Sequence, residues 1–289
     1  MATSRTLQIS DNDIEIFRHL SQYYLTAKMI YELLPILTSN AKIKSFTVLQ
    51  QRLRRLYQEG YINRDQRLSR GQGVNEYYYF LTKKGANFFE DLKQLKPAHG
   101  ILKRLELGSQ EHAFMISELM VKLEQDVWRS RGQVRIKSYI RENYFEIKLP
   151  NKSKQDPAQW LRPDGTLFVD YNQEHQLLFL EIDLSTQPVF ATNPYRSSFR
   201  KKIEIYSEFK KYFKQHPLIQ LFGPLNGYRV LTVCRSQERV RSLLDAAVTM
   251  GKEKMFWFTD LAAAKEHNLL FDPIWQLPNG SSQSLFNPH

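Results

Sequence analysis

The residues of this chain best placed for chemistry are three acids. Two of them lie on one apolar segment, and the third lies upstream of it. Asp164 follows an Arg-Pro pair, while Glu181 and Asp183 interrupt the otherwise apolar segment 177–184. Side chains alternate along a strand, so Glu181 and Asp183 are predicted to project from the same face. A strand this apolar is expected to be central, and buried carboxylates without a partner are costly. The three carboxylates therefore need a metal ion, a cationic side chain or water.

Lys202 is the candidate cation. The segment 198–214 is predicted to form an amphipathic, lysine-rich helix, and Lys202 lies beside its apolar stripe, on the inward side. A lysine in that place either extends to water or neutralises carboxylates. The structural alternative to a metal site is a buried salt bridge between Asp183 and a basic residue such as Arg196 or Lys202.

The elements that must position these residues form a mixed pattern of helices and strands. Besides the helix over 198–214, the periodicity of apolar residues predicts helices over 109–131 and 236–250. Helices and strands in this order are typical of a mixed α/β domain and not of a repeat protein. Strands are predicted over 134–140, 167–171, 177–184, 228–233 and 255–258.

The first hundred residues predict a different unit, with three helices followed by a hairpin. Ser, Asp and Asn precede the first helix as N-cap types, Pro35 helps to stop the second, and Gly60 ends the third. An Arg-rich, glycine-containing tip then separates two short strands. The expected elements are helices over 10–20, 26–35 and 45–58, a hairpin over 61–81 and a closing helix from Lys83.

Positive charge is concentrated on the third helix and the hairpin. Between Lys42 and Lys84 there are ten Lys or Arg and three acids, and the chain as a whole carries a net charge of +11. Over about residues 10–95, three helices and a basic hairpin resemble the winged helix-turn-helix of bacterial regulators. That arrangement brings Gln and Arg to base edges in a major groove and wing arginines to phosphates; the alternative is a winged helix that contacts only proteins. The candidate contacts with double-stranded DNA are Thr47, Gln50, Gln51, Arg54, Arg55, Arg64, Arg67 and Arg70.

The acidic motifs resemble those of the PD-(D/E)XK nuclease superfamily. More narrowly, the chain resembles the bacterial replication-relaxation family of mobile elements. The resemblance implies an α/β (α+β) chain with an N-terminal winged helix and a nuclease-like mixed-sheet domain. Asp183 stands where the superfamily usually has lysine, so Lys202 would have to replace that lysine. The residues that carry the resemblance after the winged helix are His112, Arg162-Pro163-Asp164, Glu181-Ile182-Asp183 and Lys202 to Tyr206.

The nuclease resemblance implies a metal-dependent DNA endonuclease. Asp164, Glu181 and Asp183 would hold Mg²⁺ or Mn²⁺, which would polarise the scissile phosphate and activate a water molecule. Lys202 would orient that water or stabilise the developing charge. Glu118 in the preceding helix is the first candidate for a further acidic residue, ahead of Glu111 and Glu124. The alternative is a DNA-binding regulator of replication or transfer whose nuclease-like domain is inactive and serves assembly.

These interpretations divide the chain into four parts. The boundaries follow the change from the basic winged helix to the mixed α/β pattern, and a connector with Pro97 and Gly100 lies between the two. The predicted parts are a winged helix over 1–95, a linker over 96–108, a nuclease-like domain over 109–272 and a loosely ordered tail over 273–289.

Composition restricts the remaining possibilities. Cys234 is the only cysteine, which excludes a disulfide framework and a multi-cysteine metal site. There is no apolar run of about 18 residues and no signal-like N-terminus, so we expect a cytoplasmic protein without a membrane partner. The expected partners are double-stranded DNA, other mobile-element or replication proteins, and a second copy of the chain in a homodimer.

Overall fold

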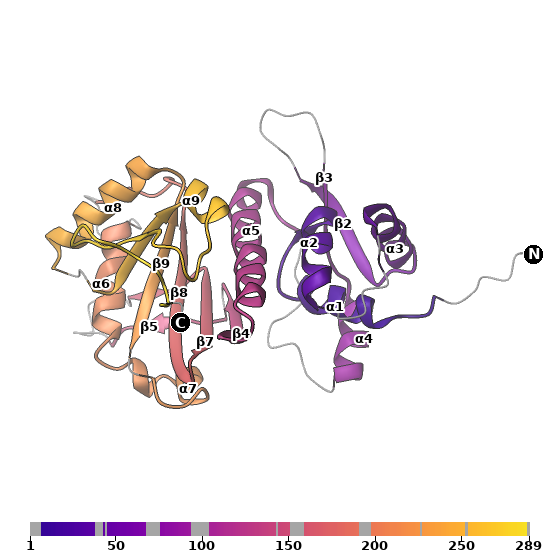
Figure 1. The fold of residues 1–289 in the computed structure, drawn as a ribbon, viewed down its shortest axis with the longest axis horizontal. Coiled ribbons are helices and arrows are strands. Elements are labelled where there is room, and N and C mark those ends of the chain that lie inside the picture. Colours follow the sequence, from indigo (N-terminus) through magenta and orange to yellow (C-terminus); the bar gives the residue numbers. More distant parts are fainter. Residues whose placement is uncertain are drawn as a thin grey trace, which may run out of the picture. The chain divides into compact units, whose positions relative to one another are not determined.

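The chain divides into two compact units, Met1–Gln125 and Asp126–His289 (Figure 1). The structure is a computed structural model. In its described part, no helix has both the length and the apolar character that a membrane span requires. The described residues are 7–37, 43, 45–67, 76–93, 104–142, 144–150, 159–190, 198–225, 227–251 and 254–287.

The N-terminal unit has the predicted order of three helices, a hairpin and a closing helix. Its small antiparallel sheet has the strand order β1-β3-β2. Two details differ from the prediction: β2 continues as far as Arg67, and α2 runs two residues past Pro35 before it ends. The elements are α1 (Asp11–Leu20), β1 (Leu25–Thr26), α2 (Ala27–Leu37), α3 (Phe46–Gln58), β2 (Ile62–Arg67), β3 (Glu76–Leu81), α4 (Lys83–Lys93) and α5 (Leu107–Arg129).

A buried acid at the start of α1 fixes the third helix. Asp13 closes a capping box, accepting hydrogen bonds from the backbone N–H and the hydroxyl of Ser10 at 2.7 and 2.6 Å. The same carboxylate, fully buried, accepts a 2.8 Å hydrogen bond from Nε of Arg52 on α3. Removal of either partner would leave a charge unpaired, so this ion pair determines how α3 is held against α1.

The first part of α5 belongs to the N-terminal unit. Phe114 packs against Tyr78 and Phe80 of β3, with the Phe114 and Tyr78 ring centroids 5.2 Å apart. The division between the units therefore lies within α5, between Gln125 and Asp126. The sequence predicted the domain boundary in the linker over 96–108. It could not do better, because helix periodicity does not reveal which sheet a helix packs on. Residues 94–103 of this region lie outside the described part.

The C-terminal unit is built on a seven-stranded mixed sheet of order β12-β11-β10-β9-β8-β7-β4. β8 pairs antiparallel with β7 and parallel with β9, and α6 and α8 pack on one face (Figure 1). The fold is therefore α+β, a winged helix followed by a mixed-sheet domain, as predicted. The elements are β4 (Val134–Arg141), β5 (Ile147–Lys148), β6 (Trp160–Leu161), β7 (Gly165–Tyr171), β8 (Glu174–Asp183), α6 (Phe199–Phe209), η1 (Phe213–Gln215), α7 (Pro217–Gln220), β9 (Tyr228–Cys234), α8 (Gln237–Thr249), β10 (Phe256–Asp260), α9 (Leu261–Glu266), β11 (Trp275–Gln276) and β12 (Ser282–Gln283).

The prediction of a loosely ordered tail is wrong for residues 273–287. β11 pairs with β10, and β12 pairs with β11, so the tail extends the sheet. Trp275 is buried and donates a 2.9 Å hydrogen bond to the Leu269 carbonyl, and Phe286 is also buried. The Pro, Gly and Ser content suggested a loop because it reports turn propensity and not the burial of two aromatic anchors.

A buried histidine and glutamate join α1 to α5 within the N-terminal unit. His19 Nδ1 lies 3.6 Å from Oε1 of Glu124, which also accepts a 3.3 Å hydrogen bond from the Tyr23 hydroxyl. Nη2 of Arg18 donates to His19 Nε2 at 2.9 Å, which places the proton of a neutral His19 on Nδ1. Burial raises the pKa of Glu124 to about 7 and lowers the pKa of His19 well below its ordinary value.

We expect Glu124→Gln to stabilise the protein at pH 8 and to have no such effect near pH 4.5. The unfolded chain loses the Glu124 proton near pH 4.5 and the folded chain near pH 7, so ionisation favours unfolding increasingly across that interval. The expected gain in the free energy of unfolding at pH 8 is about 2–3 kcal/mol. Because the pKa of His19 is lowered in the folded protein, His19 makes the protein less stable as the pH falls below 6.5. Both proteins contain His19, so this effect cancels when they are compared.

Thermal denaturation followed by circular dichroism from pH 4.5 to 8 measures this difference. Glu111→Gln changes an exposed glutamate of the same helix and is the matched control. A Glu124→Gln curve that runs parallel to the wild-type curve at every pH would contradict the assignment.

Candidate nucleic-acid interface and carboxylate cluster

The DNA contacts predicted on α3 all lie on the exposed face of that helix. The helix starts where the Ser45 hydroxyl accepts a hydrogen bond from the Val48 N–H, and it buries Leu49, Leu53 and Leu56. That apolar stripe turns the opposite face of α3 to solvent. The exposed predicted residues are Thr47, Gln50, Gln51, Arg54 and Arg55.

Arg64 is held between two tyrosines where the wing meets α3. Its guanidinium carbon lies 4.6 Å from the Tyr57 ring centroid and 4.5 Å from that of Tyr77. These rings remain 38% and 39% exposed. Planar contacts of this kind limit the orientations of the guanidinium, which also hydrogen-bonds to the Tyr79 hydroxyl.

Arg67 turns away from the wing surface and onto α5. Its guanidinium lies 4.4 Å from the Phe114 ring centroid and donates to a carboxylate oxygen of Glu118 at 2.8 Å. Two predicted site residues, one assigned to DNA and one to catalysis, are thus partners of each other inside the N-terminal unit. We therefore remove Arg67 from the phosphate contacts and Glu118 from the acidic site; Arg70 lies outside the described residues.

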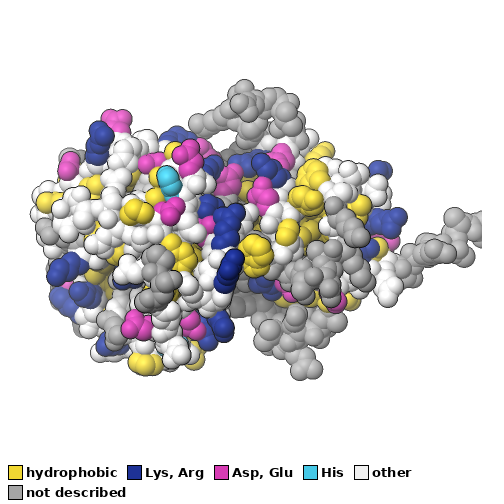
Figure 2. Space-filling model, in the orientation of Figure 1, with side chains coloured by type: hydrophobic (Ala, Val, Ile, Leu, Met, Phe, Trp, Pro, Cys, Tyr) yellow, Lys and Arg dark blue, Asp and Glu magenta, His cyan; other side chains and the backbone are white. Residues whose placement is uncertain are grey.

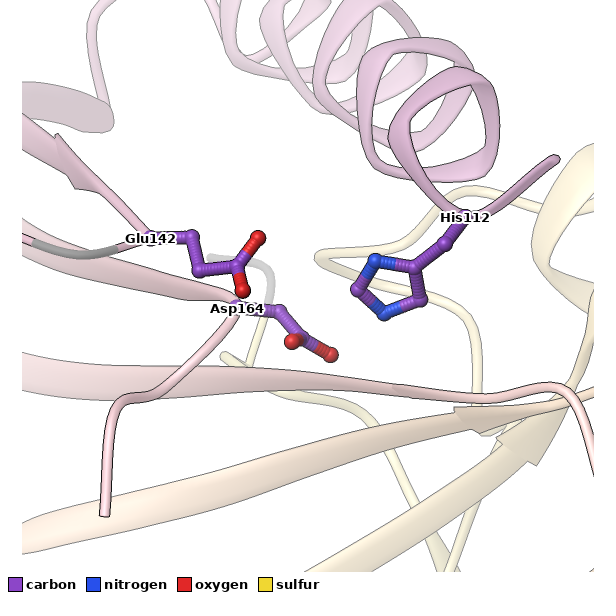
Figure 3. Close-up of side chains that lie close together, drawn as sticks. All are labelled: His112, Glu142 and Asp164. Atoms are coloured by element: carbon purple, nitrogen blue, oxygen red, sulfur yellow. The ribbon is translucent and has the colours of Figure 1, made fainter. Parts of the chain in front are cut away.

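Asp164 lies at the entry to β7, close to the end of β4. One of its carboxylate oxygens accepts a 2.6 Å hydrogen bond from the Ile182 N–H, and its carbonyl accepts one from the Glu142 N–H at 3.2 Å. A carboxylate oxygen of Glu142 also lies within 4.8 Å of one of Asp164 (Figure 3). The sequence analysis missed Glu142 because the predicted strand ended at Ile140; its position just after a strand end was the available signal.

Glu181 lies on β8 and is bound by two residues of α6. It is 1% exposed and accepts a 2.5 Å hydrogen bond from the Tyr206 hydroxyl, while its other oxygen pairs with Lys202. Lys202 thus reaches the carboxylates, as the inward side of its helix predicted. The motif from Lys202 to Tyr206 works as a pair because residues four apart share one helix face.

The charges of this cluster stabilise each other. Burial by itself would lower the pKa of Lys202, but the combined attraction of Glu181, Asp164 and Asp183 outweighs it and raises that pKa, so the lysine stays protonated. Burial raises the pKa of Glu181, and the lysine charge opposes that shift. The pKa of Tyr206 is raised by its burial and by the Glu181 charge, so the phenol keeps its proton and remains a donor.

Asp183 has a different partner from the one the sequence suggested. Arg239 at the start of α8 donates two hydrogen bonds to it, both 2.9 Å long, and also donates to the Gln187 carbonyl at 2.7 Å. The predicted partners were Lys202, which binds Glu181 instead, and Arg196, which lies outside the described residues. No sequence signal pointed to Arg239, because 56 positions separate it from Asp183 and only the β8–β9–α8 connection brings them together.

One family profile matches the part of the sequence that contains most of these residues. The profile described as replication-relaxation matches residues 22–219, which include α3, the wing, β7, β8 and α6. The chain belongs to the replication-relaxation family. A comparison with curated proteins finds no match.

Two solved structures are similar to part of this replication-relaxation protein. One is Bacillus subtilis PadR in complex with operator DNA, with 18% identity, 44% of this chain and 71% of that chain covered, and a TM-score of 0.26. The other is a PadR-like transcriptional regulator from Bacillus cereus, with 19% identity, coverage of 44% and 73%, and a TM-score of 0.25. The fold assignment above rests on strand order and packing and not on these likenesses.

In this arrangement the three predicted metal ligands of the replication-relaxation protein are already engaged by donors of the protein itself. A Mg²⁺ ion needs carboxylate oxygens that it can approach directly, at about 2.0–2.1 Å. Both oxygens of Glu181 and both oxygens of Asp183 are engaged by donors of the protein, as one oxygen of Asp164 is by a backbone N–H. The chain thus supplies its own cations to the two carboxylates on β8.

We expect Asp183→Ala to cost about 3–5 kcal/mol of unfolding free energy, because it leaves Arg239 without its buried carboxylate. Arg239→Ala should cost a similar amount, and the double variant should cost less than the sum of the two. Urea denaturation measures all three. Glu204→Ala removes the exposed partner of Arg200 on α6 and serves as the control, with an expected cost below about 1 kcal/mol. An Asp183→Ala protein no less stable than this control would contradict a buried ion pair.

Proposed function

We propose that this protein binds duplex DNA through its winged helix and that its C-terminal unit is a non-catalytic scaffold for assembly in replication or transfer. The observation that supports DNA binding is the exposed face of α3, which displays Gln50, Gln51, Arg54 and Arg55 together. An α-helix of this kind fits a major groove, where Gln and Arg bond base edges. Arg64, oriented by its two tyrosines, supplies a phosphate contact beside that helix.

The scaffold role rests on the pairing within the sheet. Lys202 and Tyr206 bind the Glu181 carboxylate, and Arg239 binds the Asp183 carboxylate. The carboxylates on the central strand therefore hold α6 and α8 in place. An acid that joins two elements in this way performs a structural task whether or not it ever binds a metal. The replication-relaxation family and the net charge of +11 both agree with a partner that is DNA.

We expect Arg54→Ala/Arg55→Ala to weaken duplex binding and to reduce the slope of log affinity against log salt concentration by about 2, since each lost phosphate contact contributes about 0.9. Gln50→Ala should instead change the preference among DNA sequences. Fluorescence anisotropy with labelled duplexes over a salt series measures both effects.

The matched control is Lys210→Ala/Lys211→Ala, which removes the same net charge from exposed positions of the C-terminal unit. If this control lowers the slope as much as the α3 variant does, charge alone explains binding and α3 is not the interface. An unchanged slope in the α3 variant would contradict the proposal directly.

A metal-dependent endonuclease is the second candidate, and one observation favours it. The carboxylates of Asp164 and Glu142 approach within 4.8 Å at adjoining strand ends, and the charge of Asp164 also acts on Lys202 (Figure 3). Two acids and a lysine are the groups from which a phosphodiester-cleaving site could be assembled.

We expect incubation of supercoiled plasmid with the wild-type protein and Mn²⁺ to give no nicking above that of Asp164→Ala. Mn²⁺ should also leave the melting temperature of the wild type unchanged relative to that variant, because a bound ion would stabilise the folded protein. Nicking that needs Mn²⁺ and is lost in Asp164→Ala would establish the endonuclease and exclude the non-catalytic role.

A further inference from the structure

Exposed aromatic rings lie around the segment that leads into β7. Trp160 on β6 is 52% exposed, and Tyr144, which precedes β5, is 40% exposed. Leu161 next to Trp160 is buried, so strand alternation turns Trp160 outward. β5 and β6 pair, with Lys148 directly opposite Trp160.

Each ring carries an arginine on one face. The Arg162 guanidinium carbon lies 4.8 Å from the Trp160 ring centroid, and that of Arg141 lies 5.0 Å from the Tyr144 centroid. Exposed fractions of 52% for Trp160 and 40% for Tyr144 show that both side chains reach solvent beside their arginines. Aromatic residues that served only the core would be more fully buried.

A third pair of the same kind occurs at the start of α6, which packs beside β6. There the Arg200 guanidinium lies 5.9 Å from the centroid of Phe190, a ring that is 53% exposed. Exposed rings paired with an arginine thus recur on three segments of the C-terminal unit.

The charges at this surface favour an anionic partner. Glu146 accepts from Arg162 at 2.9 Å and pairs with Lys148 at 2.7 Å, so one carboxylate is shared by two cations. The Lys148 and Arg162 side chains are 74% and 40% exposed and can turn to a ligand. On the face drawn in Figure 2, basic and acidic side chains of the C-terminal unit are interspersed.

We propose that the Tyr144, Trp160 and Phe190 rings, with their arginines, bind single-stranded DNA. Unpaired bases stack on open aromatic faces without regard to sequence, whereas the bases of a duplex are already stacked on each other. Arg162 and Lys148 then contact the phosphates of the same strand. This surface is additional to the duplex interface on α3, so the protein has one site for paired DNA and another for unpaired DNA.

Binding of fluorescein-labelled oligo(dT) to the full chain, followed by anisotropy, tests this assignment. Oligo(dT) forms no duplex with itself and presents only unpaired bases. Trp160→Ala should lower its affinity about tenfold, while Trp160→Phe should retain most of it because a ring remains. Quenching of tryptophan fluorescence by oligo(dT) should disappear in Trp160→Phe.

Trp128→Ala is the matched control, since Trp128 at the end of α5 is 56% exposed and lies on a different element. The Arg54→Ala/Arg55→Ala protein separates this site from the α3 interface: it should bind oligo(dT) like the wild type even where its duplex affinity falls. The inference is overturned if the wild type does not bind oligo(dT), if Trp160→Ala binds it unchanged, or if Trp128→Ala loses as much.

Discussion

The buried charge on the central strand is the constraint that organises the C-terminal unit. β8 is flanked by β7 and β9 and is buried along most of its length, yet it carries Glu181 and Asp183. A carboxylate in such a place must be compensated by a cation, and each acid recruits one from a different helix. The positions of α6 and α8 on the sheet therefore follow from two ion pairs as much as from the apolar packing around Phe179.

The same ion pairs determine which chemistry the unit can carry out. A metal at Glu181 would have to share the carboxylate with Lys202 and the Tyr206 hydroxyl, which already donate to both of its oxygens. Asp164 and Glu142 lie outside these two ion pairs, at the strand ends, although Asp164 accepts from the Ile182 N–H and its charge acts on Lys202. A fold of this type can thus keep its acidic motif as a structural element, because fold and activity are separable properties.

The N-terminal unit divides its arginines between structure and surface. Arg52 pairs with the Asp13 carboxylate, and Arg67 pairs with Glu118. Arg54 and Arg55 remain exposed, and Arg64 is oriented by aromatic rings. Charge counted along the sequence therefore overstates the charge that is available to a ligand. The difference matters for binding, because only a side chain that can reach a phosphate releases counterions.

Local pattern in the sequence determined the elements. Apolar periodicity fixed α3 and its buried stripe of Leu49, Leu53 and Leu56, and strand alternation placed Glu181 and Asp183 on one face. The position of Lys202 on the inward side of its helix could also be predicted from the sequence. Only the tertiary structure decided the partners: Arg239 for Asp183, Arg67 for Glu118, Glu142 beside Asp164, and the burial of Trp275 in the sheet. Periodicity is a property of neighbours in the chain, whereas an ion pair across 56 residues depends on how whole elements pack, which no short window of sequence encodes.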